Sequence, residues 1–233
     1  MVMAPVLNER EKISDVVTRV PRDVVDEVLV VDDGSSDGSP DVARSLGATV
    51  IELGRTIGVG AAIRTGYEYA IERGYDVAVV MAGNNKDSPE EIPLLLDPIA
   101  DDRADLVQGS RWLTGSEDFG EMPLYRRFAT RLHPAIFRLV TKTTLTDTTN
   151  GFRAVKTAVL SDPELTLDQR WLDEYELEVY LLYKAAKLGY RVEEVGVTKK
   201  YPPKSLGQTK MRPITGWWSI LRPLVLVGLH IKD

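Results

Sequence analysis

A chain of 233 residues, 43% of them hydrophobic, can bury a substantial core and is expected to form one globular domain. It contains no cysteine, which excludes disulfides and cysteine-based metal or nucleophile chemistry. Its formal net charge of −6 gives no electrostatic support to nucleic-acid binding. Neither a signal segment nor an apolar run long enough to cross a bilayer is evident, so a soluble or peripheral cytoplasmic protein is expected.

Apolar runs and helical patterns alternate through the first half of the chain. Short apolar runs that end in polar loops predict strands over 2–6, 28–31, 49–53, 76–81 and 105–108. Helices are expected over 11–20 and from Ser39-Pro40 to residue 46. A glycine-containing loop at 55–66 runs into another helix that lasts to residue 73, and a further helix starts at Ser88. Ser88-Pro89-Glu90-Glu91 has the pattern of a capping box. The alternation predicts an α/β fold with a mainly parallel sheet and helices on both faces.

Two carboxylates end the most apolar of these strands. Asp32 and Asp33 follow Val28-Leu29-Val30-Val31 and precede the turn formers from Gly34 to Gly38. Ligands of open α/β sheets bind outside the carboxyl ends of the strands, so both acids are placed where a ligand would lie. They could equally be turn formers. In the loop at 55–66, Gly58 and Gly60 could cradle a phosphate or serve close packing, and the arginines nearby favour an anion.

The second half of the chain predicts longer helices and several groups of charged residues. Helices are expected over 124–140 and 173–188, and strands after the polar loop at 145–154 and over 191–197. Cations at the start of the first helix, Arg126, Arg127 and Arg131, oppose its dipole and need another explanation. More cations follow the last strand: Lys199, Lys200, Lys204, Lys210 and Arg212.

Five stretches together resemble the family 2 glycosyltransferases of the GT-A fold, and most nearly the branch of the dolichol-phosphate mannose synthases. They are Pro5-Val6-Leu7-Asn8-Glu9 and the stretches 31–38, 58–66, 109–111 and 150–153, which together extend over most of the chain. The resemblance implies an inverting enzyme that moves a sugar from a nucleoside-diphosphate sugar to an acceptor, in the first place a polyprenyl or dolichyl phosphate. A soluble hydroxyl acceptor, or an inactive nucleotide-sugar-binding protein, is the alternative.

The resemblance also implies roles for individual residues. Those expected to bind the donor are Pro5, Leu7, Glu9, Val31, Asp33, Arg64, Ala82, Gly83, Asn84, Lys204 and Lys210. Those expected at the acceptor phosphate are Arg111, Arg126 or Arg127, and Arg153. The candidate catalytic residues are Asp147, Arg111, Lys86 and Glu176, with Asp147 or Glu176 as the base that a hydroxyl acceptor would need. Carboxylates such as Asp33 and Glu9 can accept hydrogen bonds from a base and a ribose, which agrees with the donor assignment.

The sequence departs from the family at the metal site. The family places an Asp-x-Asp motif and a glutamine where this chain has Ala82, Asn84 and Lys86. Because Mg²⁺ and Mn²⁺ prefer anionic oxygen ligands, such a cofactor is doubtful, and Asn84 and Asp87 would hold it only in a weak site. Either Lys86 neutralises the donor diphosphate instead, or catalysis has been lost.

The end of the chain is apolar and contains paired tryptophans. We expect residues 1–215 to form the glycosyltransferase domain and residues 216–233 to form a tail. Trp217 and Trp218 beside an apolar run are typical of a membrane-interface anchor, which would place the enzyme on the cytoplasmic face of a membrane. Packing of this segment on the domain itself, or on a second copy in a homodimer, is the alternative.

Overall fold

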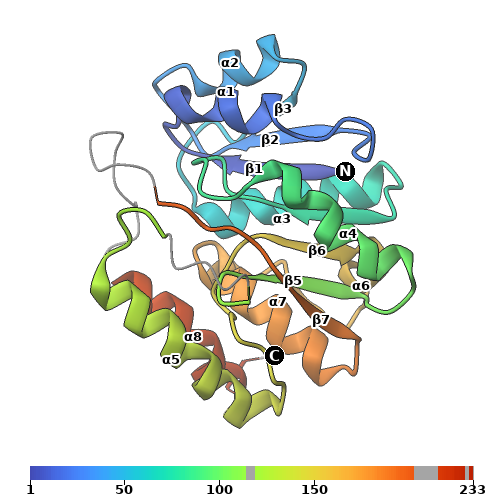
Figure 1. Ribbon diagram of the computed structural model, residues 1–233, viewed down its shortest axis with the longest axis vertical. Coiled ribbons are helices and arrows are strands. Elements are labelled where there is room, and N and C mark those ends of the chain that lie inside the picture. Colours follow the sequence, from blue (N-terminus) through green and yellow to red (C-terminus); the bar gives the residue numbers. More distant parts are fainter. Residues whose placement is uncertain (114–118, 202–214, 229–230, 233) are drawn as a thin grey trace.

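Seven strands form a single twisted sheet that confirms the predicted mainly parallel arrangement. The computed structural model describes residues 1–113, 119–201, 215–228 and 231–232 (Figure 1). In spatial order the strands are β3 (Thr49–Glu52), β2 (Val28–Asp32), β1 (Val2–Val6), β4 (Val77–Val80), β6 (Arg153–Lys156), β5 (Leu106–Ser110) and β7 (Val192–Gly196). β6 runs antiparallel to both of its neighbours, and the other pairs are parallel.

Helices cover both faces of the sheet because its central strands are apolar on both sides. One face packs against α1 (Arg10–Thr18), α2 (Ser39–Ser45) and α4 (Ile92–Ala100). The other packs against α3 (Val59–Glu72), α6 (Thr157–Leu160) and α7 (Glu176–Lys187). In β2, Val28 and Val30 enter the first layer, whereas Leu29 and Val31 enter the second. This alternation follows from the period of two along a strand.

Two further helices pack together at one end of the molecule. They are α5 (Leu124–Thr141) and α8 (Thr215–Gly228), drawn at the lower left in Figure 1. The side chains of Ile220, Leu224 and Val227 on α8 are buried in the core beside α7. Much of the apolar tail therefore packs on the protein itself, while Trp218 and Val225 stay exposed.

The predicted capping box at Ser88 is wrong. A 3₁₀ turn, η1 (Pro89–Glu91), precedes α4, and Ser88 makes no capping hydrogen bond. The carboxylate of Glu91 instead accepts hydrogen bonds from the backbone N–H of Thr198 at 2.7 Å and from its hydroxyl at 2.6 Å. Because Thr198 lies just beyond β7, Glu91 fastens the start of α4 to the segment that leads into the pocket described below.

Candidate functional site

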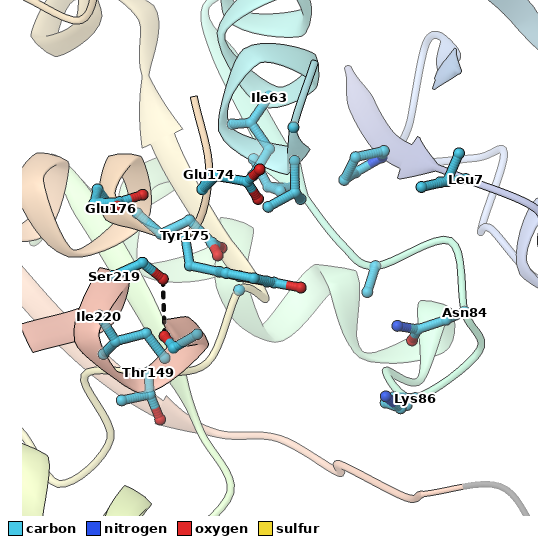
Figure 2. A pocket seen from close by; sticks show the side chains of 18 of the residues that line it. Leu7, Ile63, Asn84, Lys86, Thr149, Glu174, Tyr175, Glu176, Ser219 and Ile220 are labelled. Carbon is cyan, nitrogen blue, oxygen red and sulfur yellow. Dashed lines mark hydrogen bonds between the residues drawn. The ribbon is translucent and has the colours of Figure 1, made fainter. Parts of the chain in front are cut away.

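A pocket of about 900 Å³ opens at the carboxyl edge of the parallel strands. Its walls come from the residues that follow β1, β2, β4, β5 and β7, together with α5, the start of α7 and α8. Figure 2 shows Leu7, Asn84 and Lys86 on one side and Glu176, Ser219 and Ile220 on the other. The ring of Tyr175 projects between them from the start of α7 (Figure 2). One continuous space therefore joins the edge of the sheet to α8.

The structure places most of the residues expected to bind the donor along this pocket. Those that line it are Pro5, Leu7, Glu9, Asp33, Ala82 and Asn84, and the catalytic candidate Lys86 lines it too. Three other residues expected at the donor, Val31, Gly83 and Arg64, do not line the pocket. Val31 is buried in the core, and a Cβ on Gly83 would lie 2.5 Å from Val6 Cγ2, so Gly83 serves packing. Arg64 forms an ion pair with Asp173 at 2.7 Å. Lys204 and Lys210 lie outside the described residues.

The two carboxylates at the end of β2 have different tasks. Oδ2 of Asp32 accepts hydrogen bonds from the backbone N–H groups of Gly34 and Ser35, so Asp32 is the turn former. Asp33 lines the pocket and accepts hydrogen bonds from Ile57 N at 2.7 Å and Gly58 N at 3.2 Å through Oδ1. Burial raises the pKa of Asp33, and the charge of Asp32 adds to the effect.

The glycines at the start of α3 are explained by packing. A Cβ on Gly60 would lie 2.0 Å from the carbonyl oxygen of Leu172, and one on Gly58 would lie 2.2 Å from that of Asp173. Side chains at either position would therefore displace the backbone that leads into α7, which carries the opposite wall of the pocket. The close approach of these two segments accounts for both glycines without a bound phosphate.

Tyr201, which the sequence analysis did not single out, is surrounded by three cations. The ammonium of Lys86 lies 4.9 Å from the centre of its ring, and the guanidinium of Arg126 lies 5.7 Å away. Arg111 donates a hydrogen bond to its hydroxyl at 3.4 Å. All four residues line the pocket, so this cationic cluster, defined as Lys86, Arg111, Arg126 and Tyr201, is suited to bind an anion.

The structure separates the arginines that the sequence analysis left as alternatives. Arg126 is buried in the pocket wall, whereas Arg127 stacks over Phe119 at 5.5 Å and does not line the pocket. Arg131 likewise covers the ring of Trp112 at 4.5 Å. Aromatic rings thus account for the cations at the start of α5. Arg153 is 1% exposed and donates to the carbonyl oxygens of Glu178 and Asn150, which makes it a structural residue.

Asp147 does not have the surroundings of a general base. It is 0% exposed, lies outside the pocket lining, and accepts a hydrogen bond from Arg111 Nε at 2.5 Å through Oδ2. Its Oδ1 accepts from Arg111 Nη2 and from the backbone N–H of Thr149. A base needs a lone pair that reaches the substrate, and both oxygens of Asp147 are engaged. The assignment of Asp147 as a base is therefore corrected to that of a positioning residue for Arg111.

Glu176, the other candidate base, does line the pocket. Its carboxylate forms an ion pair with Arg222 of α8 at 2.8 Å, while Oε2 has no hydrogen-bond partner. Burial raises the pKa of Glu176. Glu174 and Tyr175 lie beside it on the same wall and were not predicted as site residues. Their sequence signal was their place in the first turn of the predicted helix over 173–188, which opens on several acids.

Comparisons with known proteins identify the family of this fold and site. Residues 1–162 match the family model described as glycosyl transferase family 2. An undecaprenyl-phosphate mannosyltransferase of Micrococcus luteus is 36% identical over 91% of this chain and 86% of its own length. A polyprenol monophosphomannose synthase of Mycolicibacterium smegmatis is 32% identical over 91% of this chain and 80% of its own. A dolichyl-phosphate hexose transferase of Haloferax volcanii is 32% identical over 96% of this chain and 91% of its own length.

Solved structures support the same fold. Glucosyl-3-phosphoglycerate synthase from Mycobacterium tuberculosis, in complex with Mn²⁺, uridine diphosphate and phosphoglyceric acid, superposes with a TM-score of 0.71. The match covers 100% of this chain and 78% of that one at 19% sequence identity. The predicted GT-A fold is thereby confirmed.

Proposed function

The chain belongs to glycosyl transferase family 2, and we propose that it transfers a sugar from a nucleoside diphosphate to the phosphate of a polyprenyl phosphate. That it is a nucleotide-sugar-dependent glycosyltransferase follows from the family and from its relatives. The acceptor class is the proposal, and it is supported by the relatives named for undecaprenyl, polyprenol and dolichyl phosphate substrates.

The observation that carries the proposal is that one pocket holds the cationic cluster together with groups suited to a nucleotide and groups suited to a lipid. Glu9 and Asp33 lie toward the sheet edge, where hydrogen-bond acceptors suit a base or ribose. Ile220 and Trp217 lie at the α8 end, where apolar side chains suit the first part of a lipid chain. Lys86, Arg111 and Arg126 line the same pocket, and we place the phosphates of the donor and the acceptor on these cations.

The chemistry then requires little of the protein beyond positioning and charge. A phosphate oxygen of the acceptor attacks C1 of the sugar, and the bond from C1 to the diphosphate oxygen breaks with inversion. The electron pair stays on the leaving diphosphate, where the neighbouring cations stabilise it. The attacking oxygen is already ionised near neutral pH, so no proton has to be removed. This agrees with the finding that Asp147 is engaged by Arg111.

A soluble hydroxyl acceptor remains the competing function, because Glu176 lines the pocket with a raised pKa. The test incubates the protein with UDP- and GDP-sugars and either undecaprenyl phosphate, undecaprenol or glycerol as a soluble hydroxyl compound. Mass spectrometry then detects the glycosylated acceptor. We expect product from the phosphate alone. Transfer to hydroxyl compounds with none to the phosphate would establish the other acceptor class, and donor binding without release of nucleoside diphosphate would indicate a binding protein.

We also propose that the outer face of α5 binds the membrane that contains the lipid acceptor. Among the described residues, no helix is long and apolar enough to cross a membrane. The outer face of α5 nevertheless carries an exposed apolar stripe, defined here as Leu124, Phe128, Leu132 and Leu139, with exposed fractions of 82%, 71%, 47% and 82%. Arg131 and Arg138 are also exposed on this helix. An apolar face with basic residues beside it suits a helix that lies on an anionic membrane surface.

The inner face of the same helix contributes Arg126 and Thr130 to the pocket. A membrane against the α5 stripe would therefore lie next to the place where we put the acceptor phosphate. Trp218 and Val225 on α8 are exposed as well and could extend this surface. The proposal includes a location on the cytoplasmic face, with which the lack of cysteine is compatible.

Polar substitution of the stripe is expected to release the protein from vesicles. The variant Leu124→Ser/Phe128→Ser/Leu132→Ser should bind vesicles of equal parts phosphatidylglycerol and phosphatidylcholine at least about 10-fold more weakly. The substitutions remove apolar side chains that the membrane would otherwise bury. Co-sedimentation measures this. A matched control, Val24→Ser/Ile71→Ser/Leu94→Ser, changes exposed apolar residues elsewhere and should bind like the wild type. Equal loss in both variants, or none in either, would contradict the proposal.

A further inference from the structure

The loop after β4 has lost the chemistry of a divalent-cation site. Of the three positions where the family keeps its metal-binding motif, Ala82 has no side-chain oxygen and Lys86 brings a positive charge. Asn84 offers one neutral oxygen, Oδ1, which is buried and has no hydrogen-bond partner. Within the described residues, no group of three or more His, Cys, Asp or Glu side chains could hold a metal. Such a donor set does not suit Mg²⁺ or Mn²⁺.

Asp87, the carboxylate that the sequence analysis considered for a weak metal site, is already engaged. It is 4% exposed, and its Oδ1 forms an ion pair with Lys199 at 2.6 Å. Its Oδ2 accepts a hydrogen bond from the backbone N–H of Ala82 at 3.0 Å, and it does not line the pocket. A cation would have to displace the ammonium of Lys199 to reach it. The weak site of Asn84 and Asp87 that the sequence analysis left open would therefore require Asp87 to leave Lys199.

Lys86 fills the place that the missing carboxylates leave. Its ammonium lies in the pocket over the ring of Tyr201, and its backbone is tied to the segment after β7 by the hydrogen bond from Lys200 N to Lys86 O at 2.9 Å. In the part of the chain that the structure describes, no carboxylate forms an ion pair with Lys86. A half-buried cation over an aromatic ring, with no ion-pair partner among the described residues, is poised to receive an anion.

The charges around Lys86 point in the same direction. Burial lowers the pKa of Lys86 to about 7, and the cations Lys199 and Arg126 add to the effect. Glu9 and Asp87 act in the opposite direction, but each already has a cationic partner, Lys12 and Lys199 respectively. Lys199 and Arg126 thus disfavour the charged form of Lys86, and a bound diphosphate would favour it.

We propose that the ammonium of Lys86, held over Tyr201, neutralises the donor diphosphate in place of a divalent cation. This rests on the proposed function, because it takes the anion to be a nucleoside diphosphate. Lys86 stays protonated throughout: it binds the diphosphate oxygens in the ground state and stabilises the charge that develops on them as the bond to the sugar breaks. Lys199 contributes indirectly, since it keeps Asp87 from repelling the same anion.

Binding of the nucleoside diphosphate tests the proposal without any acceptor. We expect UDP or GDP to bind the wild-type protein in EDTA, with an affinity that Mn²⁺ changes by no more than about two-fold. Lys86→Met should weaken this binding about 10- to 150-fold, the range for loss of a charge-assisted hydrogen bond. Lys200→Met removes an exposed ammonium from the neighbouring segment and should bind like the wild type. Isothermal titration calorimetry measures the affinities of the wild type and of both variants, and thermal melting checks that the variants are folded.

Calorimetry also reports on the proton. At pH 8, which lies above the pKa of Lys86 in the unliganded protein, most of the Lys86 side chains are neutral. The protein should take up close to one proton when the diphosphate binds, because the diphosphate favours the charged ammonium. Comparison of two buffers with different ionisation enthalpies measures this uptake, and Lys86→Met should lack it.

Three results would overturn the proposal. They are diphosphate binding that EDTA abolishes and Mn²⁺ restores, Lys86→Met binding as tightly as the wild type, and wild-type protein that binds neither UDP nor GDP in EDTA. A wrong acceptor class gives a different result: transfer to undecaprenyl phosphate then fails, while the effects of Lys86→Met on diphosphate binding persist.

Discussion

Replacement of Asp147 by alanine is expected to lower the free energy of unfolding by about 3–5 kcal/mol, since it removes one partner of a buried ion pair. Asp147 and Arg111 are 0% and 3% exposed, and the carboxylate also accepts hydrogen bonds from the backbone of Arg111 and Thr149. Without it, the guanidinium of Arg111 keeps only weak contacts, such as that with Tyr201 at 3.4 Å. Urea unfolding at neutral pH measures the change.

A second ion pair provides the control. Arg64 and Asp173 lie 2.7 Å apart, but their side chains are 16% and 21% exposed. Because solvent reaches this pair and screens it in part, Asp173→Ala should cost clearly less than Asp147→Ala. The variant Asp147→Asn keeps the shape and removes the charge, so it too should destabilise the fold. If it unfolded like the wild type and yet lost all activity, Asp147 would be a catalytic base after all.

The sheet and its edge could be predicted because their signals are local. β2 is apolar at four successive positions and ends at two acids, so the strand, its burial and the position of Asp33 at the carboxyl edge follow from the sequence. The antiparallel direction of β6 could not be foreseen, because no local pattern encodes the direction in which a strand joins a sheet.

Pairings over long sequence distances account for the errors at the site. Glu91 was expected to cap its own helix, but Thr198 lies 107 residues away and takes its carboxylate. Arg64 was expected at the donor, but Asp173 takes its guanidinium. Each side chain has a local task that its sequence permits and a distant partner that only the fold provides. The fold decides which interaction forms, because it brings the distant partner within hydrogen-bond distance.

The exposed apolar surface shows the same limit. The paired tryptophans and the apolar run drew attention to residues 217–229, yet Ile220, Leu224 and Val227 of that run are buried. The α5 stripe was overlooked because its leucines alternate with arginines, which suggests an ordinary solvated helix. Only the packing of α5 shows that His133, Pro134 and Phe137 face inward and that the leucines face outward.

Loss of the guanidinium of Arg126 is expected to raise the KM for a polyprenyl phosphate about 10- to 150-fold, the effect of one charge-assisted hydrogen bond of about 1.5–3 kcal/mol. Arg127→Met is a closely matched control, because it removes the same group from the next residue of the same helix. Arg127 covers the ring of Phe119 outside the pocket, so its loss should change KM by less than about two-fold.

Steady-state kinetics with a short-chain prenyl phosphate keep the measurement of Arg126→Met independent of membrane binding. The affinity for the nucleoside diphosphate, measured by calorimetry, separates the acceptor from the donor. Because Arg126 lowers the pKa of Lys86, its removal should if anything favour the charged form of Lys86, so donor binding is expected to persist. If Arg126→Met weakened the donor and left the acceptor KM unchanged, the two phosphates would have to exchange places in the pocket. Equal losses in the Arg126 and Arg127 variants would instead place the acceptor phosphate outside the cationic cluster.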